Sequence, residues 1–390
     1  MINLIKSTFY KEMEMKKSLC AFIKQSAQLS MGDKCAQFEK EFAIWQNRKF
    51  CAMFNSGSSA NLALIQSLIN IGYLKKGDKV GFSAITWATN VMPLIQLGLT
   101  PVPIDIEKKT LNTSKEKIAE IFKHQKIKAI FITNLLGFSD DIEAIKKFCN
   151  QNKIILLEDN CESLGSEFKK KKLGNFGIAS TFSFFVGHHL STIEGGAICT
   201  DDKKLYEAMI MTRAHGWDRN LEKNTQSEMR QKQRVDSFYA KYTFYDLGYN
   251  LRPTEIQGFL GIKQLKLIDK IIDIREKNYQ QFIKIYSNND FIKTKSLLNR
   301  TSNFAFPVIC KSEKLQQHYI KKCLANKIEV RPIVGGLMTE QPFFKKYIKN
   351  DKQGSCANAR FIHKNGFYFG NNPDMTQKEI KHIINTLKYE

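Results

Sequence analysis

Two adjacent histidines near the middle of the chain are the side chains best suited to moving protons near neutral pH. His188 and His189 lie in a polar turn that interrupts two apolar, strand-like runs. Neighbouring residues need not face the same way, so the pair offers one or two candidates for an acid/base group. The turn alone does not establish an active site.

A second candidate is an acidic group that directly follows the apolar run 154–157. It contains Glu158, Asp159 and Glu162. A carboxylate at the end of a buried strand is costly unless it has a partner. A pyridinium nitrogen would be a suitable partner, because the carboxylate keeps the ring protonated and able to accept electrons. A helix cap or a metal-binding carboxylate would explain the same segment.

Two further features would suit a flat ligand that carries a phosphate. Gly57 and Ser58 lie between a strand-like run and a helical segment, where glycine permits close approach and the helix start presents free N–H groups. Simple N-capping by serine is the alternative. Trp87 follows a strand end, where its ring could stack on a ligand or pack in the core.

These residues belong to a regular alternation of strand-like and helical segments that begins near residue 49. Such an alternation predicts a mostly parallel sheet covered by helices on both faces. Ligands bind at the carboxyl ends of the strands in such sheets, which directs attention to the loops after residues 54, 82 and 157. The predicted strands are 49–54, 80–82, 100–106, 128–133 and 154–157, and the predicted helices are 60–71, 90–97, 114–124 and 142–150.

The pattern changes after about residue 255. Apolar residues from Ile256 to Ile272 recur on one face, which predicts a long helix over 254–286. Strand-like runs at 304–310 and 328–332 enclose a helical segment at 315–326. We therefore expect a large cofactor-binding domain over 1–255, with an N-terminal extension, and a small α+β domain over 256–390.

Composition argues against several classes of protein. No apolar run approaches 18 residues and the N-terminus lacks a signal-peptide layout, so a cytoplasmic protein is expected. The 9 cysteines form no C-x-x-C pair, which favours reduced thiols over disulfides or zinc. A net charge of +22 could attract polyanions, but the lysines are dispersed and no nucleic-acid-binding module is visible.

Taken in order, these residues together with Ser183 and the segment 248–252 resemble the DegT-type nucleotide-sugar aminotransferases over nearly the whole chain. The resemblance implies the aspartate-aminotransferase-like fold (fold type I), with a large mostly parallel sheet and a smaller C-terminal α+β domain. It also implies a pyridoxal 5′-phosphate (PLP) or pyridoxamine 5′-phosphate (PMP) cofactor and a homodimer with shared active sites. The implied cofactor-binding residues are Gly57, Ser58 and Ser183 at the phosphate, Trp87 on the ring, Asp159 at the pyridinium nitrogen, Glu162, and Asn250 reaching across the dimer.

One position departs from the aminotransferases. At this position the aminotransferases carry a lysine that forms a Schiff base with the cofactor, whereas this chain has His188. An imidazole cannot form that stable bond, but it can take and return a proton. The segments 187–196 and 215–219, with Glu162, resemble the sugar 3-dehydratase branch. That branch implies PMP-dependent removal of the C3 hydroxyl from a nucleotide-linked 4-keto-6-deoxyhexose, which the likeness identifies as GDP-4-keto-6-deoxymannose, with glutamate regenerating PMP.

The likeness also suggests residues for the substrate. His215, Arg219 and Arg331 are candidates for binding the sugar and diphosphate, since an arginine fork suits phosphate oxygens. Any of the three could instead form a surface ion pair. A sibling group, the CDP-sugar 3-dehydrases, adds an iron–sulfur cluster, which needs several thiolates within reach. No cysteine lies between Cys199 and Cys310, so we expect no cluster.

Three alternatives stay open at this point. A nucleotide-sugar 4-aminotransferase would share most of these residues, although the missing lysine argues against it. A non-catalytic cofactor-binding protein belongs to a different class and would need a spoiled substrate site, whereas Asp159, His188 and Asn250 are all in place. A nucleic-acid-binding protein is a third alternative, which only the high net charge motivates.

Overall fold

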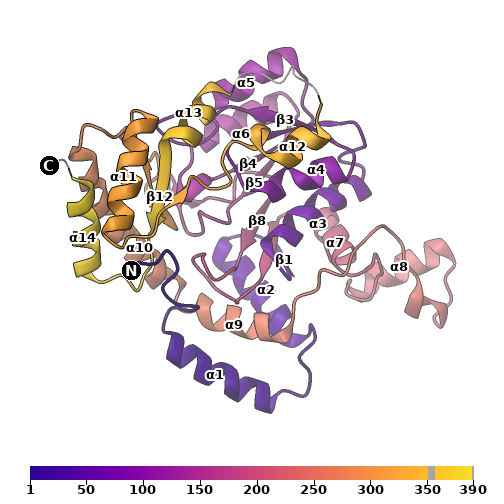
Figure 1. The fold of residues 1–390 in the computed structure, drawn as a ribbon. Coiled ribbons are helices and arrows are strands. Elements are labelled where there is room, and N and C mark those ends of the chain that lie inside the picture. The colour runs from indigo at the N-terminus through magenta and orange to yellow at the C-terminus, as the bar shows by residue number, and fades with distance from the viewer. Residues whose placement is uncertain (350–355, 389–390) are drawn as a thin grey trace.

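A seven-stranded sheet forms the centre of the protein in a computed structural model that describes residues 1–349 and 356–388 (Figure 1). Strand β9 runs opposite to the other six strands of this sheet and pairs antiparallel with β1 and β8, and the remaining pairs are parallel. The predicted mostly parallel sheet is thereby confirmed. In spatial order the strands are β1 (Phe50–Phe54), β9 (Gly196–Thr200), β8 (Ala179–Ser183), β5 (Ile155–Asp159), β4 (Ala129–Thr133), β2 (Lys79–Ser83) and β3 (Thr100–Ile104).

Helices cover both faces of this sheet, as the alternation predicts. The two faces use alternate strand residues: on β1, Ala52 and Phe54 pack with one helix layer, and Cys51 and Met53 with the other. Both layers are apolar on the side that meets the sheet. One layer holds α3 (Gly57–Asn70), α4 (Met92–Gln96) and α7 (Lys203–Arg213), and the other holds α2 (Asp33–Gln46), α5 (Lys115–His124) and α6 (Ile142–Gln151).

The single long helix predicted over 254–286 is wrong. The structure has two helices, α9 (Glu255–Leu265) and α10 (Ile268–Phe282), separated at residues 266–267. The apolar spacing continues across the break, because Ile262, Ile268 and Ile272 all pack into the same cluster. With neither glycine nor proline at the break, periodicity alone could not reveal it.

A second, antiparallel sheet lies in the C-terminal part of the chain, in the order β10 (Ala305–Ile309), β12 (Gly366–Gly370), β11 (Arg331–Pro332). The strand predicted at 328–332 is therefore shorter than expected. The helices of this part are α11 (Glu313–Ala325), α12 (Pro342–Tyr347), α13 (Ala357–Asn365) and α14 (Gln377–Leu387).

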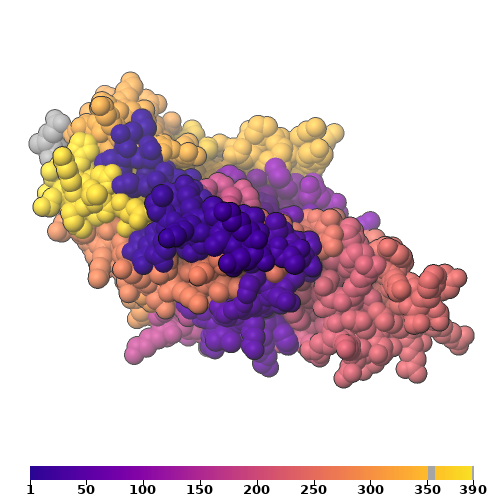
Figure 2. Space-filling view, turned by 90° about the horizontal axis from the view of Figure 1, so that it is seen from below, coloured from indigo at the N-terminus to yellow at the C-terminus, as the bar shows by residue number. Residues whose placement is uncertain are grey.

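The N-terminal residues join this C-terminal part. The N–H of Ile2 donates to the carbonyl of Lys327 at 2.7 Å, and the N–H of Leu4 donates to the Glu329 carboxylate at 2.8 Å. In Figure 2 the indigo start of the chain lies against the yellow C-terminal helix. α1 (Glu12–Gln25) then packs along α9. The domain boundary at residue 255 stays a prediction.

Smaller elements complete the fold. The run of four lysines that ends at Lys172 contributes to a hairpin of β6 (Glu167–Phe168) and β7 (Lys171–Lys172). α8 (Lys223–Gln233) has no buried residue and projects from the body (Figure 1). Among the residues described, no helix is long and apolar enough to cross a membrane.

Candidate active site

A cavity of about 360 Å³ lies where β5 and β8 end and α3 begins. It draws on segments far apart in the sequence, including the N-terminal residues Leu4 and Ile5 and the C-terminal Tyr368. The structure therefore brings most of the predicted site residues to one place. Those lining it are Gly57, Ser58, Trp87, Asp159, Glu162, Ser183, His188 and Arg331.

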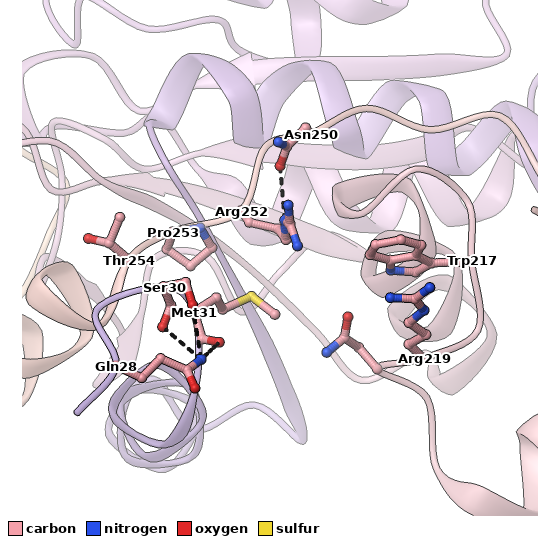
Figure 3. A pocket seen from close by; sticks show the side chains of 10 residues that line it. Gln28, Ser30, Met31, Trp217, Arg219, Asn250, Arg252, Pro253 and Thr254 are labelled. Carbon is pink, nitrogen blue, oxygen red and sulfur yellow. Dashed lines mark hydrogen bonds between the residues drawn. The ribbon is translucent and has the colours of Figure 1, made fainter. Parts of the chain in front are cut away.

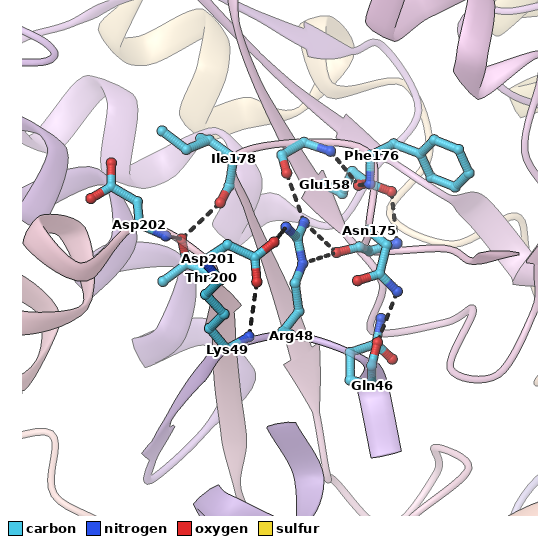
Figure 4. A network of polar contacts seen from close by, with 12 residues as sticks. Gln46, Arg48, Lys49, Glu158, Asn175, Phe176, Ile178, Thr200, Asp201 and Asp202 are labelled. Carbon is cyan, nitrogen blue, oxygen red and sulfur yellow. Dashed lines mark hydrogen bonds and ion pairs between the residues drawn. The ribbon is translucent and has the colours of Figure 1, made fainter. Parts of the chain in front are cut away.

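The alternation of β5 separates its two neighbouring carboxylates. Glu158 faces away from the cavity and is fully buried, where its oxygens accept the N–H groups of Gly174 (2.8 Å), Phe176 (2.7 Å) and Gly177 (2.7 Å) (Figure 4). These donors replace water around the charge. Glu158 thus anchors a loop, and Asp159 is the carboxylate that the strand presents to the cavity.

Asp159 is held in place by neutral donors. One carboxylate oxygen accepts from the side-chain amides of Asn90 (2.7 Å) and Asn61 (3.2 Å), and the other accepts the N–H of Cys161 (2.9 Å). The side chain is only 3% exposed, and no ion pair to it is found in the described part of the chain. A buried carboxylate bound only by neutral groups fits a cationic partner in the cavity, such as a protonated pyridine nitrogen.

Asn61 and Asn90 were missed by the sequence analysis. Both are fully buried, and each reaches Asp159 from a different segment. For Asn61 the available signal was a polar residue on a mostly apolar helix, and Asn90 had none because it lies in the short segment after Trp87.

The start of α3 and the end of β8 approach closely beside Gly57. A Cβ at Gly57 would lie 2.7 Å from the Cβ of Ser183 and 3.1 Å from its Oγ. Ser56 caps the helix by accepting the N–H of Ser59 at 3.0 Å, so N-capping accounts for Ser56 and leaves Ser58 free to face the cavity. A helix start with two serine hydroxyls and no obstructing Cβ fits a phosphate group.

Gly57→Ala is expected to weaken cofactor binding by about tenfold or more, because the new methyl group pushes the helix start away from Ser183. Titration of the apoprotein with PMP, followed by absorbance, measures the effect. Gly32→Ala is the matched control: it also lies at a helix start, and its added Cβ would meet no atom closer than 3.4 Å. Equal affinities in the two variants would contradict the assignment.

Trp87 lines the cavity and is 55% exposed. The alternative of a core tryptophan is therefore excluded. Its indole is available to lie against a flat ring, as the resemblance implies.

The two histidines face different surroundings. His189 is buried and its Nε2 lies 2.8 Å from the carbonyl of Ser302, which makes it a structural residue. The ring of His188 lines the cavity, with ring centroids 5.5 Å from Phe304 and 6.3 Å from Phe185. Its Nδ1 is buried and has no hydrogen-bond partner among the described residues. His188 is thus the one of the pair that can act on a ligand.

Burial and, to a smaller extent, the positive charge of Arg275 together lower the pKa of His188 to about 4, although a backbone hydrogen bond with Cys161 opposes both. The imidazole is therefore neutral at physiological pH. A neutral imidazole without a hydrogen bond on Nδ1 can accept a proton, which is what a general base requires.

Burial shifts the pKa of Glu162 upward, in the direction opposite to that of His188. Glu162 is 7% exposed, lines the cavity, and accepts the N–H of Leu136 at 2.6 Å. Burial, with a smaller contribution from the nearby charge of Asp159, raises the pKa of Glu162 to about 8, although the hydrogen bond from Leu136 opposes this shift. Near neutral pH the side chain is therefore a carboxylic acid, which can donate a hydrogen bond into the cavity.

We expect the stability of the cofactor-free protein to fall as pH rises through 8. The folded state holds the Glu162 proton that the unfolded chain releases near pH 4.5, so this stabilisation is complete below pH 4.5 and is lost through the folded pKa of about 8. The loss amounts to about 1.5 kcal/mol between pH 6.5 and 8. His188, whose pKa is lowered, acts with the opposite sign and only below about pH 6.5.

Chemical denaturation across pH 6.5–8.5 checks this prediction. In this window the free energy of unfolding of Glu162→Gln should depend less steeply on pH than that of wild type, because the amide does not titrate. Identical slopes in wild type and Glu162→Gln would show that another group carries the dependence.

Three predicted residues lie outside this cavity. Asn250 and Arg219 line a separate pocket of about 430 Å³ (Figure 3), where Asn250 accepts from Arg252 Nε at 3.0 Å. The guanidinium of Arg219 stacks 4.0 Å above the ring of Trp217. His215 adopts a φ of +59° and its ring lies 5.0 Å from Trp217. Within one chain, these residues do not meet the cavity that holds His188.

The ion pair expected as an alternative for Arg331 is present, and the role of Arg331 in substrate binding stays a prediction. Arg331 lines the cavity, and it also pairs with Glu329 through Nη2 at 2.8 Å and Nε at 3.1 Å. The ion pair is exposed enough to open for an anionic ligand.

No cluster of three potential metal ligands is found among the described residues, and all 9 cysteines are free thiols. Most of these thiols are buried, including Cys51 and Cys199. The expectation of no iron–sulfur cluster stays a prediction.

Comparisons with known proteins agree with this geometry. The model of the DegT/DnrJ/EryC1/StrS aminotransferase family matches residues 11–388. GDP-4-keto-6-deoxy-D-mannose 3-dehydratase from Yersinia pseudotuberculosis is 36% identical over 367 residues, 93% of each chain. A structure of GDP-4-keto-6-deoxymannose-3-dehydratase with a trapped PLP-glutamate geminal diamine has a TM-score of 0.90 at 34% identity and covers 100% of both chains.

A more distant structure supports the fold alone. An aminotransferase of Helicobacter pylori involved in pseudoaminic acid biosynthesis is 23% identical, with a TM-score of 0.85 over 99% of this chain and 98% of its own. The predicted aminotransferase-type α/β fold is confirmed.

Proposed function

Because the chain belongs to the DegT/DnrJ/EryC1/StrS aminotransferase family, we propose that it is a PMP-dependent nucleotide-sugar 3-dehydratase. The substrate is a nucleotide-linked 4-keto-6-deoxyhexose, GDP-4-keto-6-deoxymannose by its likeness to the dehydratase from Yersinia pseudotuberculosis. The product is a 3,6-dideoxy-4-keto sugar. The observation that carries this proposal is the imidazole of His188, which faces the cavity where the aminotransferases have a lysine.

The residues of the cavity suit the cofactor that the proposal requires. Gly57, Ser58 and Ser183 would hold its phosphate, Trp87 would lie on its ring, and Asp159 would pair with the ring nitrogen. PMP, when bound, supplies an amine that engages the C4 ketone and a protonated ring that accepts electrons during loss of the C3 oxygen.

His188 moves the protons of the reaction. Its neutral ring takes a proton in the cavity, and the imidazolium so formed can return that proton to the departing C3 hydroxyl. The low pKa of His188 favours the second step, because an imidazolium in this environment gives up its proton readily. Glu162 lines the cavity, and its carboxyl is neutral near pH 7. It can therefore donate a hydrogen bond to the cofactor or the sugar.

The proposal includes a homodimer with shared active sites. Asn250, Arg219 and His215 lie away from the cavity that holds His188 in their own chain, and we infer that they serve the corresponding cavity of a second copy. The segment that carries them also exposes large apolar side chains, which favour burial against a partner. These are Phe238, Tyr239, Tyr242, Phe244 and Leu247, each between 56% and 77% exposed. We also keep the predicted cytoplasmic location, which suits an enzyme that uses glutamate and a nucleotide sugar.

A product assay tests the function. Protein loaded with PMP and mixed with GDP-4-keto-6-deoxymannose should release one ammonia for each C3 oxygen lost, and glutamate should allow repeated turnover. A 4-aminotransferase would instead give a stable 4-amino sugar and no ammonia. That result, or no reaction at all with PMP bound, would overturn the proposal.

A further inference from the structure

A buried guanidinium lies directly behind the His188 turn. Arg275, on α10, is 3% exposed. It donates to the carbonyl of His188 at 3.3 Å through Nη2, and through Nη1 to the carbonyls of Phe304 (3.2 Å) and Asn371. One side chain therefore ties together the active-site turn, the start of β10 and the end of β12.

Two of these hydrogen bonds help to fix the position of the His188 imidazole. His188 provides one carbonyl, and Phe304, which provides another, has its own ring 5.5 Å from the His188 imidazole. The third bond is reinforced, because the Asn371 amide donates back to the Arg275 carbonyl at 2.9 Å and accepts from Asn278 at 3.1 Å. The guanidinium thus fixes both the backbone of His188 and the ring packed against it.

The charge of Arg275 is poorly compensated. No carboxylate lies within ion-pair distance in residues 1–349 and 356–388; Asp374 is the acid that acts on it, from farther away. Burial lowers the pKa of Arg275 to about 9, which still leaves it protonated near neutral pH. Burying an unpaired cation is costly, and backbone carbonyls alone could have been satisfied by a neutral donor.

We propose that Arg275 is a positioning residue for the dehydration: it fixes the imidazole of His188 through backbone carbonyls and places a positive charge behind it. The inference rests on the proposed function, because it assigns Arg275 to the proton transfers of His188. Arg275 is not among the residues that line the cavity, so it acts through His188 and does not touch the ligand.

The charge has a direct consequence for the base. Arg275 opposes protonation of His188, whose pKa is already lowered by burial, and so helps keep the imidazole neutral. The other titratable groups around the imidazole are Asp159 at the end of β5, Cys161 and Glu162 just after it, His189 beside it in the chain, Glu194 before β9, Arg331 on β11 and Tyr368 on β12.

Two substitutions separate the two parts of this role. Arg275→Lys keeps the charge but loses the fork that reaches several carbonyls, so kcat should fall about tenfold with the pH profile unchanged. Arg275→Gln keeps an amide donor but loses the charge, so the acid limb of the kcat profile should move up by about 0.5 to 1 pH unit. KM for the sugar should change little in either variant.

A second readout does not depend on turnover. Diethyl pyrocarbonate modifies neutral imidazoles, and peptide mass spectrometry of the cofactor-free protein gives the rate at His188 as a function of pH. Arg275→Gln should shift this titration upward by the same amount as the kinetic limb. The matched control is Lys277→Gln, which removes a charge from the exposed side of the same helix and should shift neither.

The outcomes distinguish this inference from the function on which it rests. If wild type does not dehydrate the sugar, the proposed function fails. If wild type dehydrates it, either of two results overturns the role of Arg275. One is that Arg275→Lys keeps the wild-type kcat. The other is that the pH dependence of His188 modification is the same in Arg275→Gln as in Lys277→Gln. Should Arg275→Gln fail to fold, the kcat of Arg275→Lys decides.

Discussion

His188→Asn is expected to lower the rate of C3 deoxygenation by a factor of about 10² to 10⁴, the usual contribution of a positioned acid or base. Asparagine occupies similar space beside Phe304 but cannot take up a proton. PMP affinity should be nearly unchanged, because Asp159 and the phosphate-facing residues are untouched. Single-turnover measurement of ammonia release, with cofactor absorbance recorded in parallel, separates the two quantities.

His188→Lys extends the same test. A lysine restores the group that the aminotransferases use, and we expect it to lose dehydration as completely as asparagine does. Dehydration at the wild-type rate by either variant would show that another group moves the proton.

The neighbouring histidine provides the control. His189 bonds to the carbonyl of Ser302 and does not line the cavity. His189→Gln should therefore lower thermal stability while folded molecules keep a kcat close to that of wild type. A loss of catalysis in His189→Gln as large as in His188→Asn would mean that both act through the shape of the turn.

Asp159→Asn is expected to raise the dissociation constant of PMP about 100-fold, which corresponds to about 3 kcal/mol for removing one partner of a buried charge pair. The amide cannot pair with a protonated ring nitrogen, and its NH₂ group would face the donors of Asn61 and Asn90. Activity should fall with affinity, because the neutral ring accepts electrons less readily.

Thermal denaturation with and without PMP measures this without an activity assay. At a PMP concentration of about 100 times the wild-type dissociation constant, wild type should gain about 2.7 kcal/mol of stability and Asp159→Asn only about 0.4 kcal/mol. Similar gains in both proteins would remove Asp159 from the cofactor site.

Glu158→Gln is the matched control for Asp159→Asn. It changes the adjacent buried carboxylate, which holds a loop through backbone N–H groups and faces away from the cavity. It should destabilise the protein by about 1 to 3 kcal/mol, since one amide NH₂ then meets backbone donors. The increment in stability from PMP should remain that of wild type.

Part of this site could be predicted from sequence because local rules govern it. The βα alternation placed Gly57, Asp159 and Trp87 in loops at one edge of a parallel sheet, and the structure brings all three to one cavity. Other parts could not be predicted. Asn61 and Asn90 meet Asp159 only after α3 and the segment beyond β2 are packed on the sheet. The break between α9 and α10 carries no local signal.

The sequence by itself determined which residue types were available: a histidine in place of a lysine, a carboxylate at the end of β5, and a glycine at the start of α3. Only the tertiary structure decided which member of each adjacent pair faces the cavity. It selects His188 over His189 and Asp159 over Glu158, because orientation depends on the surroundings of each side chain. It also decided the protonation of His188, because burial lowers its pKa and the charge of Arg275, 87 residues away in the chain on α10, acts in the same direction.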